Sequence, residues 1–159
     1  MRRTKGFSLI ELLLVVAIIL IITAIAVPSF LSSRMAANES AAVGALRSLN
    51  TAQISYNTTY ATVGFAANLT ALSGDCTGGT VPSSSGACLI DSVLESGTKS
   101  GYSFTLQGVS GSTASSYQVI AAPKNSMTGV HSFCSFEDAL IRVSQTVIAT
   151  CDSTVPEQQ

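Results

Sequence analysis

The sequence predicts an α+β fold in which one long N-terminal helix packs on a C-terminal antiparallel sheet of three to four strands. An apolar run begins at Phe7, and an amphipathic pattern with helical spacing continues it to Tyr60. Short segments of alternating apolar and polar residues follow residue 100, which is typical of strands. A stretch rich in Gly, Ser and Thr, residues 61–100, separates the two regions and predicts a long loop.

Composition limits the kinds of protein that this chain can be. Its 159 residues include 8 Lys and Arg against 9 Asp and Glu, a formal net charge of −1. Only 11% of the residues are charged, against roughly 25% in an ordinary soluble domain. A basic nucleic-acid-binding protein is excluded, because there is no surplus of positive charge to neutralise phosphates. An acidic disordered protein is excluded because 47% of the residues are hydrophobic.

The apolar residues are concentrated near the N-terminus. Between Phe7 and Leu31, 20 of 25 residues are apolar, and Glu11 is the one charged residue. As a helix, residues 7–27 would span roughly 30 Å, the thickness of a bilayer core. Three positive charges precede the run and no acid does, which predicts an N-terminus on the cytoplasmic side.

Two general interpretations of this segment remain open at this point. It could be a secretory signal with a small-residue cleavage site at Ala24-Ile25-Ala26, releasing a binding module or an enzyme. It could instead be a plain membrane anchor. Neither explains Glu11, because a carboxylate within an apolar helix is costly and by default indicates a function.

A third interpretation uses all of these features together. The run Gly6-Phe7-Ser8-Leu9-Ile10-Glu11, after a short basic leader and before an apolar helix, resembles the class III signal of type IV prepilins. Pro28 lies 21 residues after Phe7, as in the N-terminal helix of that family, and the run Arg34–Glu39 is also pilin-like. The resemblance covers residues 1–60 and is weak beyond them.

The resemblance implies how the N-terminus is processed and what Glu11 does. A prepilin peptidase would cut between Gly6 and Phe7, removing the leader, residues 1–6, and the new amine of Phe7 would be methylated. Gly6 fits this cut because the lack of a Cβ lets an extended backbone lie close to an active site. In a filament, the Glu11 carboxylate would pair with the Phe7 amine of a neighbouring subunit and set the axial register.

The helix is expected to have two parts. Residues 7–28 would form the membrane-spanning and filament-core helix, and Pro28 is expected to kink or locally melt it by removing one hydrogen bond. Residues 29–60 would form an amphipathic helix, with Arg34, Glu39 and Arg47 solvated. The face predicted to pack on the sheet follows spacings of three and four residues: Leu46, Leu49, Gln53, Tyr56 and Tyr60.

The region after Tyr60 is predicted to hold short helical turns and then the sheet. Helical turns are expected at residues 68–73 and 89–95 within the loop of residues 61–100. The sheet and the disulfide-tied C-terminal region would occupy residues 101–159. The strand predictions in that region are 102–106, 117–121, 130–136 and 140–143, with a short edge segment at 147–149.

Four cysteines lie beyond the apolar segment: Cys76, Cys88, Cys134 and Cys151. An even number on the exported side predicts disulfides, and three connectivities are possible. We favour sequential pairing, Cys76–Cys88 and Cys134–Cys151, because each bond would close a short loop and contribute about 3 kcal/mol. A zinc site is disfavoured, since there is no Cys-x2-Cys pair and His131 is the lone histidine.

No residue pattern in the sequence predicts catalysis, a metal or a cofactor. No nucleophile elbow and no phosphate-binding loop is present, and His131 is interpreted as an ordinary strand residue. Asp91 and Glu95 are interpreted as a solvated helix face.

The expected function is therefore that of the structural major subunit of a type IV pilus. The subunit would be stored in the bacterial inner membrane and polymerised into a surface filament for adhesion, twitching motility or DNA uptake. Its partners would be its own copies, the prepilin peptidase and N-methyltransferase, and the assembly platform with its ATPases. Contact of the filament with a surface or with DNA is a further expectation. The alternative is a pseudopilin of a type II secretion system, or a minor pilin.

Overall fold

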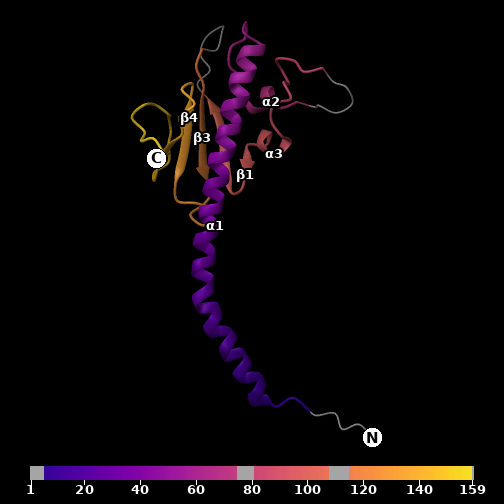
Figure 1. Ribbon diagram of the computed structural model, residues 1–159, viewed down its shortest axis with the longest axis vertical. Helices are drawn as coiled ribbons and strands as arrows, with labels where there is room; N and C mark the ends of the chain where they lie inside the picture. The colour runs from indigo at the N-terminus through magenta and orange to yellow at the C-terminus, as the bar shows by residue number, and fades with distance from the viewer. Residues whose placement is uncertain (1–5, 75–80, 108–114, 159) are drawn as a thin grey trace. The chain divides into compact units, whose positions relative to one another are not determined.

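The computed structural model describes residues 6–74, 81–107 and 115–158 and divides into two compact units, Met1–Arg34 and Met35–Gln159. The fold is α+β, as the sequence predicts, with three helices and a sheet of five strands in the described residues (Figure 1). The elements are α1 (Leu9–Thr59), α2 (Leu69–Leu72), α3 (Ser92–Glu95), β1 (Thr98–Lys99), β2 (Tyr102–Gln107), β3 (Gln118–Pro123), β4 (Ser132–Phe136) and β5 (Arg142–Ser144).

Helix α1 continues through Pro28, so the expected local melting at this residue does not occur. Proline lacks an N–H, and the helix therefore loses the bond to the carbonyl four residues earlier, yet the flanking residues stay helical. Apart from Pro28 and Gly44, α1 contains no residue that strongly disfavours a helix, and it extends over 51 residues.

The part of α1 in the second unit provides one side of the hydrophobic core, and Figure 1 shows it lying along the sheet. Leu46, Leu49 and Tyr56 are fully buried there, and Tyr60 packs against the same core while half-buried. These are residues of the predicted stripe. The exposed positions of Arg34 and Arg47 also agree with the sequence, whereas Glu39 does not stay solvated.

The sheet is antiparallel throughout and follows chain order, β1-β2-β3-β4-β5. Its alternation of faces is clear: Val119, Ala121 and Phe133 contribute to the core with α1, while Ile120 and Cys134 face the other side. The sheet has five strands rather than three to four, because the two-residue β1 lies inside the region predicted as loop. A strand of two residues has no detectable alternation.

The expected edge segment at residues 147–149 is not a strand. Instead, the C-terminal residues pair with β5: the Val143 N–H donates to the Pro156 carbonyl at 2.8 Å, and the Gln158 N–H donates to the Ile141 carbonyl at 2.9 Å. This pairing covers backbone groups that would otherwise be exposed at the sheet edge.

A disulfide joins Cys134 in β4 to Cys151, with 5.8 Å between the Cα atoms. This bond is one of the two expected from sequential pairing. It ties the C-terminal segment to the face of the sheet opposite α1, where Ile120 and Ile148 complete a small apolar cluster. The other expected bond involves Cys76, which lies outside the described residues, and the Cys76–Cys88 pairing stays a prediction.

Two buried amides on α1 connect the helix to the rest of its unit. The Gln53 side chain pairs with one backbone residue: its Nε2 donates to the Ala66 carbonyl at 3.0 Å, and its Oε1 accepts from the Ala66 N–H at 2.8 Å. Asn50 donates to Ser135 Oγ at 2.8 Å and accepts from the Tyr117 hydroxyl at 3.1 Å. A buried polar group without such partners would cost free energy, so these bonds help to specify how the helix packs.

We expect Gln53→Ala to lower the free energy of unfolding by about 2 kcal/mol, because it leaves the buried N–H and carbonyl of Ala66 unpaired. The measurement is thermal unfolding of the full chain in detergent, followed by circular dichroism. Thr51→Ala is the matched control, since Thr51 is exposed on the same helix and bonds only within it. A Gln53→Ala variant as stable as the control would contradict this role.

Candidate functional site

The first residues of the described chain lie outside the helix. The first helical hydrogen bond runs from the Leu12 N–H to the Ser8 carbonyl at 3.2 Å, so Gly6 and Phe7 precede α1 as an exposed, non-helical segment. A Cβ added to Gly6 would meet no atom of the chain within 4 Å. The fold therefore does not require glycine at this position, and any requirement for it comes from whatever binds the segment.

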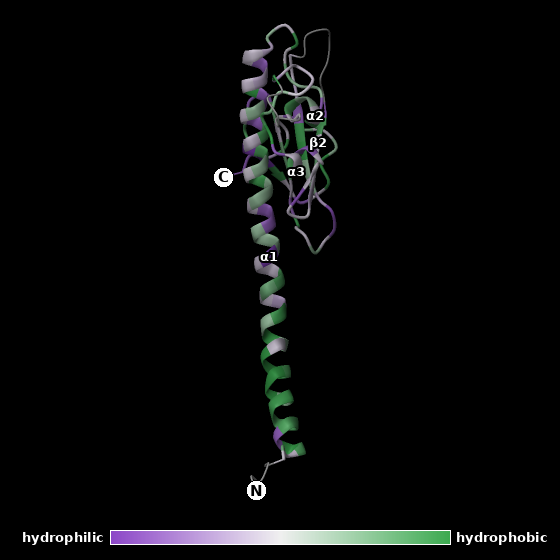
Figure 2. Ribbon diagram, turned by 90° about the vertical axis from the view of Figure 1, so that its right-hand side faces the viewer, coloured by the Kyte–Doolittle hydropathy of each residue, from purple (hydrophilic) through white to green (hydrophobic). Residues whose placement is uncertain are grey.

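The apolar part of α1 is uncovered within its own unit. Its most apolar 18-residue window has a mean hydropathy of 3.1 and is 0% buried, and Figure 2 shows apolar colouring along this part of the helix. Phe7 is 77% exposed and Ile25 is 74% exposed. Burying one such side chain is favourable by roughly 1.5–3 kcal/mol. The segment is long and apolar enough to cross a membrane and would be strongly unfavourable in water.

Glu11 differs from Thr23 and Ser33 of this helix in having no internal partner among the described residues. Thr23 donates its hydroxyl to the Ile19 carbonyl at 3.0 Å, and Ser33 donates to the Ser29 carbonyl at 3.0 Å, so the helix itself satisfies both. Glu11 forms no hydrogen bond and no ion pair with any residue that the structure describes. It lies in the first turn of α1, where the helix dipole favours a negative charge. This carboxylate is thus free to bind a cation from outside the chain.

The structure places the predicted site residues in two groups. Gly6, Phe7, Glu11 and Pro28 belong to the first unit, with Phe7 and Glu11 four residues apart, and the cysteines belong to the second. Among the described residues there is no group of three or more His, Cys, Asp or Glu side chains that could hold a metal ion.

The N-terminal segment is similar to segments of known proteins. Residues 1–27 match the model of the prokaryotic N-terminal methylation motif. Over 54 residues the chain is 48% identical to the type IV major pilin protein PilA of Myxococcus xanthus, covering 34% of this chain and 24% of that protein. The N-terminal segment is similar to that of a type IV pilin. The type IV wide pilus major component PilA4 of Thermus thermophilus is 54% identical over 39 residues, 24% of this chain and 30% of that protein.

The likeness to type IV pilins is confined to part of each chain. The chain spans less than a third of the length of the curated relatives that it matches. No solved structure matches the chain.

Sequence reasoning missed a second feature, a clasp that Glu39 forms with the loop before β4. Glu39 Oε1 accepts from the N–H groups of Val130 at 2.8 Å and His131 at 3.2 Å, and its Oε2 lies 3.0 Å from His131 Nδ1. The prediction that Glu39 is solvated is therefore wrong. The partners are more than 90 residues apart in sequence, so no local pattern could have indicated the contact.

Neighbouring contacts strengthen this clasp. Asn38 Nδ2 donates to the Thr128 carbonyl at 3.0 Å, and the Tyr102 hydroxyl donates to the His131 carbonyl at 2.8 Å. Two adjacent residues of α1 thus hold the turn between β3 and β4 in place. His131 is a part-buried member of this contact, but it directly precedes β4 and does not lie in the strand as the sequence predicts.

The hydrogen bonds at the clasp shift the titration of Glu39. Partial burial acts to raise the pKa of this carboxyl, but the bonds from the Val130 N–H, the His131 ring and the His131 N–H outweigh it and lower the pKa below its ordinary value of 4.5. A group whose pKa is lower in the folded state stabilises the fold above its unfolded pKa. That contribution is lost as the pH falls through the lowered value.

We expect Glu39→Gln to cost about 1.5 kcal/mol of unfolding free energy at pH 7, because the amide keeps an acceptor oxygen but loses the charge. The difference from the unmodified chain should be smaller at pH 3 than at pH 7, because Glu39 itself takes up a proton as the pH falls through its lowered pKa. Unfolding by urea at both pH values measures it. Glu137→Gln is the control, since Glu137 is exposed and accepts no bond from the described residues. A pH-independent difference would contradict the role of the charge.

Proposed function

We propose that this chain is the structural major subunit of a type IV pilus. The observation that carries the proposal is the uncovered apolar helix with one unpaired carboxylate in its first turn, in a segment that matches the N-terminal methylation motif. The matched relatives are named as major components of type IV pili, which supports the same role. The role is structural rather than catalytic.

The proposed processing acts on the exposed segment before α1. A prepilin peptidase hydrolyses the peptide bond between Gly6 and Phe7, and an N-methyltransferase then methylates the Phe7 amine. The accessibility of both residues and the absence of any internal need for glycine at position 6 support this proposal. The apolar helix stays attached to the mature subunit, unlike a secretory signal.

The proposed assembly step pairs Glu11 with the Phe7 amine of a neighbouring copy. In an apolar bundle, an unpaired carboxylate is costly, and two opposite charges within about 4 Å attract more strongly than they do in water. Pairing between copies therefore favours one axial register over its alternatives. The free state of Glu11 in the single chain supports this step, because no internal bond has to be broken first.

The apolar helix fits storage in the bacterial inner membrane with a cytoplasmic N-terminus, followed by transfer into a surface filament. Transfer replaces lipid contacts by contacts between helices, which are stabilised by close packing and by the charge pair. An assembly platform and its ATPases would supply the work of extraction. The second unit would stay on the outer side, where the Cys134–Cys151 disulfide is stable in an oxidising compartment. The filament could then contact surfaces or DNA.

We expect Glu11→Ala to leave membrane insertion intact and to lower the yield of filaments at least tenfold, which corresponds to about 1.4 kcal/mol. Yield is measured on sheared filaments, and mass spectrometry of the N-terminus records cleavage before Phe7 and its methylation. Thr23→Val is the matched control, since the Thr23 hydroxyl is already bonded within the helix. Normal filament yield from Glu11→Ala would contradict the assigned pairing.

Electron microscopy of cells that lack the gene tests the proposed function itself. We expect surface filaments to disappear and to return with the complementing gene. Retained filaments together with failed export of secreted enzymes would instead indicate a type II secretion pseudopilin. A mature chain beginning at Val27, found in the medium, would indicate a cleaved signal and overturn the proposal.

A further inference from the structure

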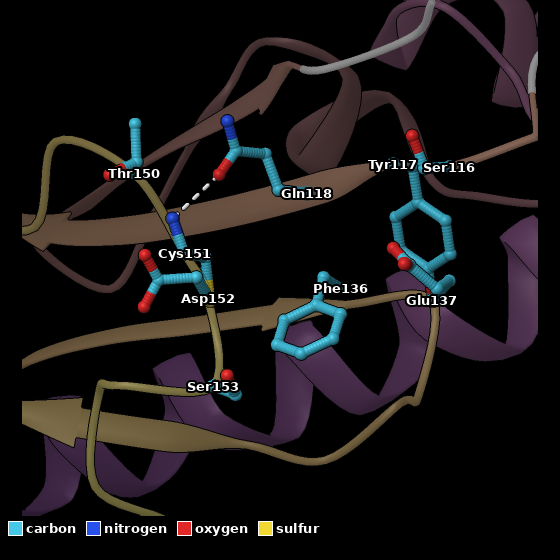
Figure 3. A pocket seen from close by; sticks show the side chains of 9 residues that line it. All are labelled: Ser116, Tyr117, Gln118, Phe136, Glu137, Thr150, Cys151, Asp152 and Ser153. Atoms are coloured by element: carbon cyan, nitrogen blue, oxygen red, sulfur yellow. Dashed lines mark hydrogen bonds between the residues drawn. The ribbon is translucent and has the colours of Figure 1, made fainter.

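A groove lies at one end of the sheet, beside the start of β3 and the end of β4. It has a volume of about 470 Å³. Figure 3 shows the Phe136 ring lying between the carboxylates of Glu137 and Asp152 in this view. An aromatic ring and two carboxylates that line one groove suit a ligand that is partly apolar and positively charged.

The two carboxylates of the groove form no ion pair within the described chain, although Asp152 accepts hydrogen bonds from Thr154 and its pKa is lowered by them and by the charge of Arg142. Glu137 and Asp152 are exposed, and neither forms an ion pair with a residue that the structure describes. The nearby Arg142 is committed elsewhere: its guanidinium bonds both oxygens of Asp138, at 3.2 and 2.7 Å, and stacks 4.2 Å from the centre of the Phe136 ring. This end of the sheet therefore carries excess negative charge.

The titration of Tyr117 is consistent with this negative charge. Burial raises the pKa of the Tyr117 hydroxyl to about 12, and the charges of Asp138 and Glu137 act in the same direction.

The opposite end of the sheet presents complementary chemistry on the turn between β3 and β4. Lys124 is exposed there and has no ion-pair partner among the described residues, and the Met127 side chain is 68% exposed. The turn is internally bonded: the Thr128 N–H donates to the Asn125 carbonyl at 3.1 Å, and the Met127 N–H donates to Asn125 Oδ1 at 3.0 Å. At the C-terminal end of the turn, the N–H groups of Val130 and His131 donate to Glu39. A rigid turn thus presents an apolar side chain and a cation to the outside.

The groove and this turn cannot meet within one copy. Strand β3 begins at Gln118, opposite Phe136 at the groove, and ends at Pro123, opposite Tyr102 and next to Lys124 (Figure 1). Six residues of strand separate the two ends by roughly 17 Å. Two complementary surfaces at opposite ends of one domain join different copies head to tail, and such a contact repeats into an open filament when the rotation between copies does not close a ring.

We propose that the turn of residues 124–130 in one copy docks into the groove at Phe136, Glu137 and Asp152 in a second copy of this chain. Lys124 pairs with the two carboxylates, and Met127 packs against the apolar surface of the groove. This contact rests on the proposed function, because it names the partner of the second unit within the filament. A thioether against an aromatic ring and an ammonium against carboxylates are both favourable contacts, and the preformed turn loses little entropy on docking.

Charge reversal in filaments of the full chain tests this contact. Lys124→Glu and Glu137→Lys should each lower filament yield about tenfold, because each brings like charges together. The double variant carries the swapped pair at every interface and should recover to within about threefold of the unmodified chain. Arg47→Glu is the control, since Arg47 is an exposed cation of α1 without an ion pair in the described residues, and it should keep normal yield. Met127→Ser should lower the temperature at which filaments dissociate.

Cross-linking gives a direct second measurement. A carbodiimide joins a lysine to a carboxylate that it contacts, and we expect mass spectrometry of treated filaments to find Lys124 joined to Glu137 or Asp152. Since these residues lie at opposite ends of the sheet, such a product joins two copies. Filaments that form normally with Lys124→Glu, a double variant no better than the single ones, or an absent cross-link would each overturn the contact while leaving the pilus function standing. An unmodified chain that forms no filament would overturn both.

Discussion

An apolar helix that its own unit leaves uncovered is the constraint on which the proposed function depends. Side chains of this segment are up to 77% exposed, and the segment contains one carboxylate without a described partner. Exposure of such a surface to water would be strongly unfavourable, and the proposed function covers it with lipid and then with other copies. Apolar contacts are not directional, so they can hold helices together without specifying their register. In the proposed filament, the single carboxylate of Glu11 would supply the missing specificity, since only a few registers would pair it.

In the second unit, two kinds of contact hold the sheet against α1. Leu46, Leu49 and Tyr56 provide apolar contact, and the amides of Asn50 and Gln53 add directional bonds that only one arrangement satisfies. The Glu39 clasp fastens the turn before β4 to the same helix. Here too, apolar packing contributes most of the stability, and the directional hydrogen bonds specify the arrangement.

Periodic patterns made most of the fold predictable, and contacts between distant residues account for what was missed. The helix, its buried stripe and strands β2 to β4 follow from spacings of three, four and two residues. Strand β1 is too short to show alternation. A kink or local melting is expected at Pro28, and the helix does not melt there. Gly6, Phe7 and Glu11 can be proposed as site residues from the sequence because they form one local motif. Glu39 cannot, because its partners Val130 and His131 are far away in sequence and adjacent only in the fold.

The proposed contact between copies depends on the clasp, because the clasp fixes the turn of residues 124–130. A binding surface on a loose turn would lose entropy on docking, whereas bonds from Asn38 and Glu39 have already fixed this one. Because both residues belong to α1, the helix that would form the filament core also positions the surface that would contact the next copy. A weak contact repeated at every subunit is sufficient in a polymer, since each copy is held at several places at once. The contacts of Lys124 and Met127 are therefore sufficient to join the second units of neighbouring copies.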